Sequence, residues 1–362
     1  VAFVAYALAR SAAYRARIPA PATSALSPLA GTTTEPAVPP AIILTAIGIS
    51  GMCALAAEVI WTRNLSLRLG ATVYTFSIIL AVFLIGLGLG SSLGATLARD
   101  YSRPRLLLAL SQFLQVGAIA WAAWMISGSL PHWPIEPGTH ASASVKFQLD
   151  LVRCAWAILP SAFLWGASFP LALACTVTSG GDAARPVGRA YAANTLGAIT
   201  GAVLASLALI PWLGTRNSQL LLMLVSAGGA VLVFQPRRAT ERILAAAGLA
   251  LAGFAASEVR PIPWQLVAYG RQVATTDYGA RALFFGEGMN SSVAVSQTDN
   301  GARFFHVSGK TEASSLSTDM RLQRMLGHLP ALLHPQPKSV LIVGCGAGVT
   351  SGSFVLHPSI RR

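Results

Sequence analysis

The chain has few charged residues for its length and very few acidic ones. Only 11% of its 362 residues are charged, and 13 acidic residues stand against 26 lysines and arginines, a net charge of +13. In ordinary soluble domains about a quarter of the residues are charged. With 54% hydrophobic residues and a mean hydropathy of +0.59, the composition excludes an ordinary soluble globular protein. The length suits two domains.

Cysteine and histidine are also scarce, and neither type is clustered. The six histidines form no group with metal-ligand spacing. The four cysteines are far apart in apolar segments and show no metal or redox spacing: Cys53, Cys154, Cys175 and Cys345. We therefore predict small buried cysteines and no metal centre.

The basic residues lack the pattern of a nucleic-acid-binding protein. Such proteins gather Lys and Arg on one face, with aromatic residues between them where bases stack. Here the arginines are scattered in short segments between apolar runs. Basic residues in short loops set the orientation of membrane proteins instead. The sequence thus predicts the lipid bilayer as a partner and no nucleic acid.

Long apolar runs predict a membrane domain over residues 41–260. Each run approaches or exceeds the roughly 20 residues that cross a bilayer. They cover residues 41–57, 72–97, 106–127, 150–177, 190–212 and 217–235, and a weaker run covers 243–257. We expect six or seven spans in a multi-pass cell-membrane protein of the bacterial inner-membrane type. Residues 1–40 are expected to hold a partial span and a linker rich in Pro, Ala, Ser and Thr, and the chain is expected to be a fragment at both ends.

The charge of the loops predicts their side of the membrane. The loops after the second, fourth and sixth complete spans are rich in arginine and are therefore expected to be cytoplasmic: Arg99/Arg103/Arg105, Arg185/Arg189 and Arg237/Arg238/Arg242. If 243–257 also crosses, everything after residue 260 lies outside the cytoplasm. If it lies on the membrane surface, that part stays inside, where nucleoside cofactors are available. The sequence leaves both arrangements open.

Two features inside the predicted spans are candidates for packing or function. Small residues recur every fourth position at Gly86/Gly90/Gly94 and at Gly197/Gly201/Ala205, which favours tight helix packing over a substrate path. Glu58, near Arg63 at a membrane edge, is the strongest intramembrane functional candidate. An interfacial ion pair between the two is the favoured interpretation of Glu58.

After about residue 261 the pattern is that of a second domain. Alternating residues 292–297 and 303–308, separated by Asp299-Asn300-Gly301, predict a β-hairpin. A capped amphipathic helix is predicted from Ser317 to the prolines at 335 and 337. Residues 339–343 predict a buried parallel strand that runs into Gly344, Gly346 and Gly348, a loop that could cradle a nucleoside. We therefore expect the start of an α/β, Rossmann-type domain after the hairpin.

The order of these segments resembles the spermidine synthase family, and more closely its bacterial membrane-fused branch. The resemblance covers roughly residues 41–362. It is carried by residues 288–295, 307–314, 319–330 and 334–344 and, in the membrane half, by residues 57–63, 83–91, 166–170 and 187–197.

The resemblance implies a methyltransferase-like domain over residues 261–362, incomplete at its C-terminus, and a chemistry. Such enzymes transfer an aminopropyl group from decarboxylated S-adenosylmethionine, a co-substrate, to the amine of a polyamine. Gly344, Gly346 and Gly348 match the cofactor loop, and Gln323 and Asp319 match positions near the substrate. Two residues depart from the family: Ala347 replaces an aspartate and Ser291 a glutamine. The catalytic aspartate is expected beyond Arg362, so no catalytic residue is predicted within the chain.

Three interpretations of function follow. The first is an integral-membrane aminopropyltransferase-like enzyme. The second is a transporter or sensor whose degenerate domain binds a nucleoside or polyamine without turnover. The third is a membrane scaffold. Expected partners are the bilayer and a small polyamine or nucleoside ligand, and a homo-oligomer remains open.

Overall fold

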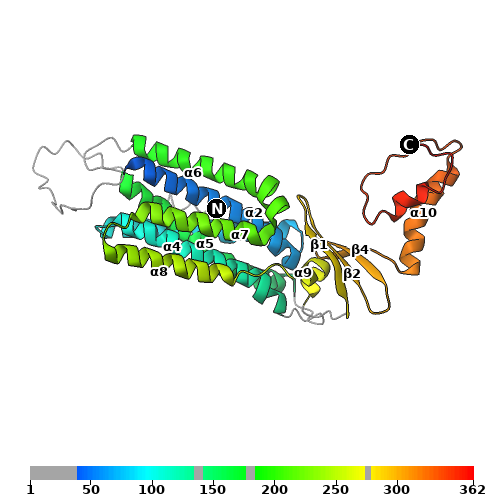
Figure 1. Ribbon diagram of the computed structural model, residues 1–362, viewed down its shortest axis with the longest axis horizontal. Coiled ribbons are helices and arrows are strands. Elements are labelled where there is room, and N and C mark those ends of the chain that lie inside the picture. Colours follow the sequence, from blue (N-terminus) through cyan, green and yellow to red (C-terminus); the bar gives the residue numbers. More distant parts are fainter. Residues whose placement is uncertain (1–38, 134–141, 177–183, 274–278) are drawn as a thin grey trace, which may run out of the picture. The chain divides into compact units, whose positions relative to one another are not determined.

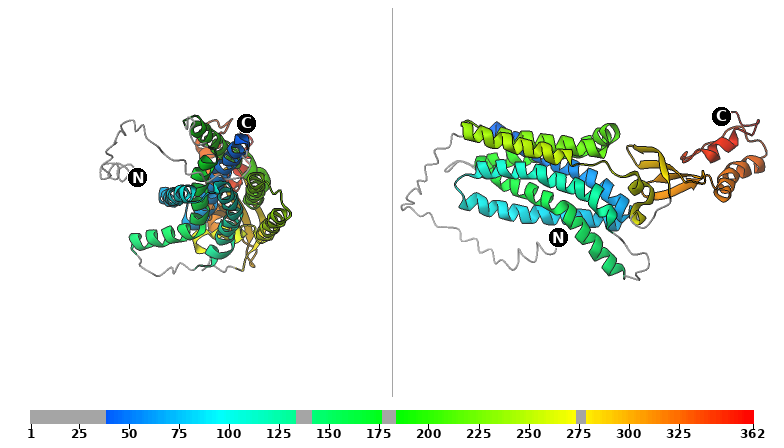
Figure 2. Two further views of the ribbon diagram at one scale, coloured as in Figure 1. Left: turned by 90° about the vertical axis from the view of Figure 1, so that its left-hand side faces the viewer. Right: turned by 60° about the horizontal axis from the view of Figure 1, so that its bottom comes forward.

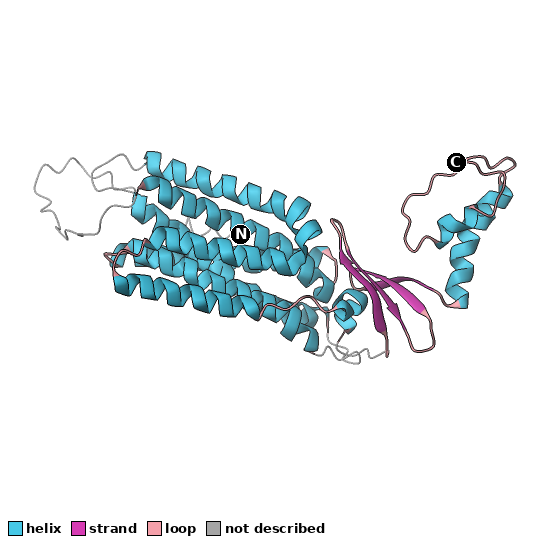
Figure 3. Ribbon diagram, in the orientation of Figure 1, coloured by secondary structure: helices cyan, strands magenta, loops and turns pink. Residues whose placement is uncertain are grey.

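The computed structural model describes residues 39–133, 142–176, 184–273 and 279–362. Within these residues a bundle of long helices is followed by a small antiparallel sheet and two further helices (Figures 1 and 3). The partial span and linker predicted over residues 1–40 lie almost wholly outside the described residues. The division of the chain into domains at residues 40 and 260 stays a prediction.

The predicted apolar runs are long helices, as Figure 2 shows in two further views. Six helical segments are long and apolar enough to cross a membrane, which is compatible with a multi-pass protein. The weaker run is among them, as α8. The helices are α2 (Pro40–Leu69), α3 (Val73–Asp100), α4 (Pro104–Trp124), α5 (Ala143–Thr176), α6 (Ala184–Leu204), α7 (Ile210–Phe234) and α8 (Ala239–Ser257). Short π- and 3₁₀-helical turns, η1 (Met125–Ser129) and η2 (Leu130–His132), extend α4.

The segment Ala184–Phe234 is one apolar stretch that breaks in the middle. A continuous helix of its 51 residues would be about 75 Å long, more than twice the hydrocarbon core of a bilayer. A π-helical turn, η3 (Ala205–Leu209), follows α6, and Gly214 leaves the helical conformation with φ 73° and ψ 168°. Both α6 and α7 pack on α2, so the chain doubles back near Gly214. The break falls between the runs predicted at 190–212 and 217–235.

The small-residue ladders lie where helices pack most closely, as predicted. A Cβ at Gly90 of α3 would stand 1.8 Å from the Phe163 carbonyl oxygen of α5. One at Gly197 of α6 would stand 1.9 Å from the Gly48 oxygen of α2. No side chain fits at such distances, so the glycines are required for the contact of these helix pairs.

The predicted hairpin is confirmed as part of a four-stranded antiparallel sheet. Its strands are β1 (Arg281–Glu287), β2 (Ser292–Gln297), β3 (Arg303–Val307) and β4 (Lys310–Ser314), in the order β1-β2-β3-β4. Val293 pairs with Val307 and Gln297 with Arg303 across the hairpin. Its turn contains Gly301 at φ 82°, the positive φ that the Asp-Asn-Gly sequence predicts.

The sheet is joined to the helix bundle through a small apolar cluster. The short helix α9 (Trp264–Tyr269) contributes Leu266 and Val267, which pack with Leu67 of α2 and Ala294 of β2. The amide of Gly309, in the turn between β3 and β4, donates to the Val267 carbonyl at 2.7 Å. The C-terminal end of α2 therefore belongs to the apolar cluster on which the sheet packs.

The last part of the chain holds α10 (Ser317–Leu333) and α11 (Val349–Phe354). The amphipathic helix is confirmed as α10, although no side chain caps its N-terminus. The strand predicted over residues 339–343 is wrong: these residues form no strand, and Leu341 and Val343 are 90% and 93% exposed. A strand exists only beside a hydrogen-bonded strand. The backbone around this segment bonds to Arg361 and Arg362, through Lys338 and Val340, and among the described residues no strand lies beside it. The Rossmann-type domain accordingly stays a prediction.

Candidate functional site

The three glycines of the predicted nucleoside loop all adopt positive φ angles. Gly344 has φ 88°, Gly346 53° and Gly348 79°. A Cβ at Gly344 or Gly346 would meet no other atom within 4 Å. The backbone conformation, and not crowding by the protein, therefore requires glycine there. The space beside Gly344 and Gly346 is open, as a ligand that approaches the backbone would need.

Asp319 and Gln323 lie one turn apart on α10 and converge on the end of β4. The Asp319 carboxylate accepts hydrogen bonds from the amide and the hydroxyl of Ser314, the latter at 2.8 Å. The Gln323 side-chain amide donates to the Ser314 carbonyl at 3.2 Å. Both side chains are half-buried. In the structure these two side chains attach α10 to the end of β4, a role that the sequence did not predict.

The structure also ties Gln323 to the glycine segment. Thr350, two residues after Gly348, donates its hydroxyl to the Gln323 carbonyl at 2.9 Å. One turn further along α10, a Cβ at Gly327 would stand 2.7 Å from the Thr350 carbonyl oxygen. Helices α10 and α11 are therefore in close contact. Of the residues predicted for the site, Asp319 and Gln323 are thus linked through Ser314, and the glycine segment reaches Gln323 through Thr350.

A cavity of about 600 Å³ lies beside this cluster. It is bounded by Leu326, Pro330 and Ala331 of α10, by residues 338–343 and by Thr350 and Phe354 around α11. Close by, His328 and His357 share a hydrogen bond of 3.0 Å between Nδ1 and Nε2. Sequence reasoning missed this pair because the two histidines are 29 positions apart and belong to no spaced motif. In the part of the chain that is described, no group of three or more His, Cys, Asp or Glu residues could hold a metal.

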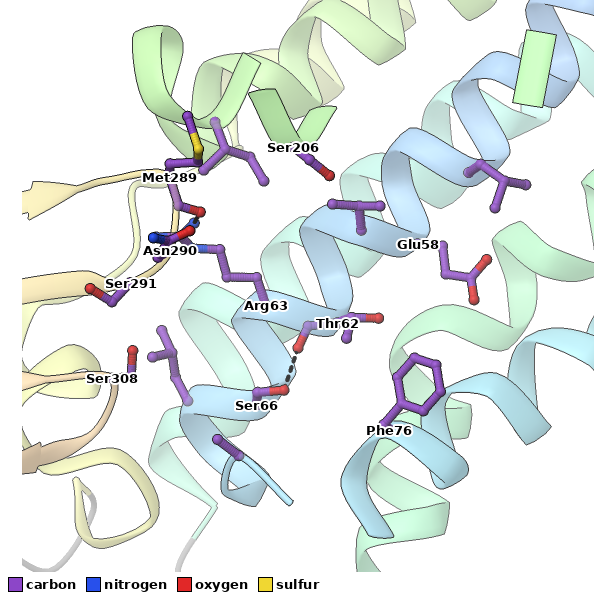
Figure 4. Close-up of a pocket in the computed structure, with 15 residues that line it drawn as sticks. Glu58, Thr62, Arg63, Ser66, Phe76, Ser206, Met289, Asn290, Ser291 and Ser308 are labelled. Atoms are coloured by element: carbon purple, nitrogen blue, oxygen red, sulfur yellow. Dashed lines mark hydrogen bonds between the residues drawn. The ribbon is translucent and has the colours of Figure 1, made fainter. Parts of the chain in front are cut away.

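A second cavity, of about 510 Å³, lies where α2 meets the turn between β1 and β2 (Figure 4). Arg63 reaches this turn and donates to the Met289 carbonyl at 3.1 Å and to the Ser292 hydroxyl at 3.2 Å. Glu58 lines the same cavity from the opposite side of α2. Ser291, which departs from the family pattern, also lines it.

The ion pair expected between Glu58 and Arg63 is wrong. The described residues form two ion pairs, Asp150 with Arg153 and Asp150 with Arg271, and Glu58 is in neither. Each helical residue turns the chain by about 100°, so positions five apart point about 140° away from each other. Residues three or four apart are the ones that can meet on a helix. Glu58 and Arg63 therefore point in different directions, as Figure 4 shows.

Comparison with known proteins gives one distant relationship. No family model matches the chain, and no solved structure matches it. Polyamine aminopropyltransferases of two Leptospira biflexa serovar Patoc strains are each 30% identical to the chain over 70 residues. The match covers 19% of this chain and 25% of each relative. The chain thus has a distant spermidine synthase-like relationship over that stretch, and it spans about a quarter of the length of these relatives.

Proposed function

We propose that this chain belongs to an integral-membrane, spermidine synthase-like protein that transfers an aminopropyl group from decarboxylated S-adenosylmethionine to a polyamine. The observation that carries the proposal is the link from Gln323 through Thr350 to the glycine segment. This link holds one of the two α10 residues matched to the substrate side beside the loop matched to the cofactor. The 70-residue similarity to polyamine aminopropyltransferases supports the same chemistry.

In this reaction an amine nitrogen of the acceptor attacks the aminopropyl carbon next to the sulfonium. A C–N bond forms, the C–S bond breaks, and methylthioadenosine leaves with the bonding electron pair. The attacking amine must first lose a proton to a base. We assign no described residue as that base, because the Asp319 carboxylate already accepts two hydrogen bonds from Ser314. The open glycine loop would hold the nucleoside, and α10 would position the acceptor.

The test is an assay of the full chain reconstituted in bilayers. Decarboxylated S-adenosylmethionine and putrescine are supplied together, and methylthioadenosine and spermidine are quantified by mass spectrometry. Equimolar formation of both products is expected. Methylthioadenosine alone should raise the melting temperature, because a ligand of the native state stabilises it by mass action. Absence of both the products and the shift contradicts the proposal.

One observation favours the second candidate, a membrane transporter or sensor. Ala347 puts a methyl group where the family resemblance implies a carboxylate for the cationic aminopropyl side. A site with one carboxylate fewer suits binding without turnover. Uptake of labelled spermidine into proteoliposomes separates the transporter from the enzyme, since the enzyme predicts none. A melting shift with methylthioadenosine but no products indicates the sensor.

A further inference from the structure

Glu58 is a carboxylate inside an apolar helix, and no residue of the described chain neutralises it. It stands 11 residues before the end of α2 at Leu69, about 17 Å along the helix. It takes part in neither ion pair, and among the described residues no hydrogen bond to its side chain is found. An unpaired charge among apolar side chains costs free energy, and ionisable residues in membrane helices commonly mark a ligand or ion path.

The cavity in front of Glu58 has walls of two kinds. Leu55, Val59 and Phe76 give it an apolar side, continued by Ile210 of α7. Its other polar lining residues are Arg63, Asn290 and five hydroxyl residues: Thr62, Ser66, Ser206, Ser291 and Ser308. The α2 residues that line it extend from Leu55 to Leu67, over about three turns and about half of the helix circumference. The cavity can thus take a molecule with one polar end and an apolar body.

The neighbouring cation, Arg63, hydrogen-bonds to groups other than Glu58. The Arg63 guanidinium donates to the Met289 carbonyl and the Ser292 hydroxyl, on the side of α2 that faces the sheet. Figure 4 shows Glu58 on the other side, toward Phe76. Arg63 therefore does not balance a charge on Glu58, and a cation bound in the cavity would do so.

The chemistry of the walls selects the kind of cation. A calcium ion takes six to eight oxygen ligands and commonly several carboxylates, whereas the cavity has one carboxylate. A quaternary ammonium group is held by a cage of aromatic rings, and here Phe76 is the aromatic residue of the wall. A primary ammonium group has three donors in a compact head. The Glu58 carboxylate and the Thr62 hydroxyl, one helical turn apart on α2, offer acceptors for them.

We propose that this cavity binds a primary amine, with its ammonium group on the Glu58 carboxylate and its carbon chain along Leu55, Val59 and Phe76. The amine reaches the site either from the bilayer, as an amphiphile, or from water. The site shares no residue with the glycine segment or with α10. Ser291, at the position of the family's glutamine, does line it.

The experiment uses the full chain in phosphatidylcholine nanodiscs, since phosphatidylcholine has no primary amine. The probes are n-decylamine, n-decanol as its uncharged equivalent, and spermidine. Affinity is measured by calorimetry, and the melting temperature is followed in parallel. Glu58→Gln keeps the shape of the side chain and removes its charge. Glu258→Gln, on an exposed residue at the end of α8, is the matched control.

We expect at least one of the two amines to bind, at least tenfold more weakly to Glu58→Gln and equally to Glu258→Gln. Decanol should bind both variants alike. If only the binding of decylamine depends on Glu58, the bilayer is the source of the amine. If only the binding of spermidine depends on Glu58, the source is the aqueous phase. Equal affinity of wild type and Glu58→Gln for both amines, or no binding of either, overturns the proposal. Because Glu58 holds no partner in the fold, Glu58→Gln should melt no lower than wild type without ligand, so folding does not obscure the result.

Discussion

Among single residues, Gly346 gives the sharpest test of the predicted nucleoside loop. Its φ of 53° is a conformation that a β-branched residue resists, and the protein leaves the space beside it empty. Gly346→Val should abolish methylthioadenosine binding, because its side chain fills the space through which a ligand approaches the backbone. Calorimetry on the full chain measures this.

The control for Gly346→Val separates conformation from bulk. Asn adopts positive φ far more readily than Val, so Gly346→Asn should keep the loop conformation while it still adds a side chain. Loss of binding in both variants indicates that the ligand needs the space. Retained binding in Gly346→Asn would show that the backbone conformation alone matters, and unchanged affinity in both would refute the assignment of the loop.

His306 of β3 makes the stability of the sheet depend on pH. It is 1% exposed, and its ring nitrogens bond the hydroxyls of Ser296 at 2.8 Å and Thr311 at 3.1 Å. Burial lowers the pKa of His306 below its usual 6.5, and a hydrogen bond to the Ala268 backbone opposes this only in part. Arg271 and Lys310 line the cavity of about 680 Å³ beside it.

The sign of the His306 effect follows from the lowered pKa. Below about pH 6.5 the unfolded chain takes up the proton more readily than the folded one, so the stability present above pH 6.5 declines as the pH falls. Between pH 7.5 and 5.5 the melting temperature of the wild type should therefore fall more than that of His306→Gln, which cannot titrate. Each kcal/mol lost from the free energy of unfolding lowers the melting temperature by roughly 2–4 °C in a domain of 150–250 residues. Identical pH dependence in both proteins would contradict this role.

Between helices, one glycine position can be compared with a neighbour on the same helix. Gly90 of α3 faces the Phe163 carbonyl, whereas a Cβ at Gly88 meets nothing within 4 Å. Gly90→Ala should destabilise the bundle by about 1–3 kcal/mol or more, the usual cost of overpacking. Gly88→Ala should leave stability unchanged or raise it by up to about 1 kcal/mol, because alanine favours helix. Thermal unfolding in detergent gives both values, and equal effects would contradict the packing of α3 on α5.

The elements show which parts of the fold the sequence could predict. Helices and hairpin carry their own signals, since apolar runs and period-two alternation are local properties. The π-helical turns around residues 125–129 and 205–209 carry no such signal. The strand predicted over residues 339–343 was wrong because an apolar run predicts burial between neighbouring strands. Whether such neighbours are present is a property of the tertiary fold, not of the run itself. The Gly214 break was located because apolar runs separated near that residue.

The candidate site was predictable only where a motif is contiguous. The glycines at 344–348 were found from their spacing, and their positive φ angles agree with it. The convergence of Asp319 and Gln323 on Ser314 depends on how β4 turns into α10, which spacing does not encode. The cavity in front of Glu58 combines α2, α3, α7 and the turn between β1 and β2. A sequence can nominate Glu58, but it cannot show that Arg63 points away.

In the whole molecule, the sheet is joined to one end of the helix bundle. Thr215, just after the Gly214 break in α7, donates its amide and hydroxyl to Glu287 of β1, both at 2.8 Å. The end of α2 is held to the end of α4 by Arg68, which donates to the carbonyl of Leu130 at 3.1 Å. At the other end, Arg105 of α4 donates to the carbonyls of Val233 and Phe234, which end α7. The arginine-rich segments near residues 99–105 and 237–242 belong to this second end.

This arrangement leads to a prediction about the side of the membrane on which the sheet lies. Helix α8 begins beside Arg237 and Arg238 and ends before the sheet, and it packs on α4 and α7. If α8 crosses the bilayer and the arginine-rich end is cytoplasmic, residues 259–362 are outside the cytoplasm. In a Cys345→Ser background, a cysteine replacing Asn300 in the hairpin turn should react with a membrane-impermeant maleimide in intact cells. One replacing Arg237 should react only after lysis.

The labelling result bears directly on the proposed chemistry. If Asn300→Cys is labelled from outside, the glycine loop faces a compartment that must be supplied with its nucleoside. Aminopropyl transfer then requires export of the co-substrate, and the result favours a sensor that binds its ligand without turnover. If only Arg237→Cys is labelled in intact cells, the orientation is reversed: the sheet lies where nucleoside cofactors are made, and the enzyme needs no further supply. The two cysteines stand on opposite ends of the same bundle, so one experiment decides between these arrangements.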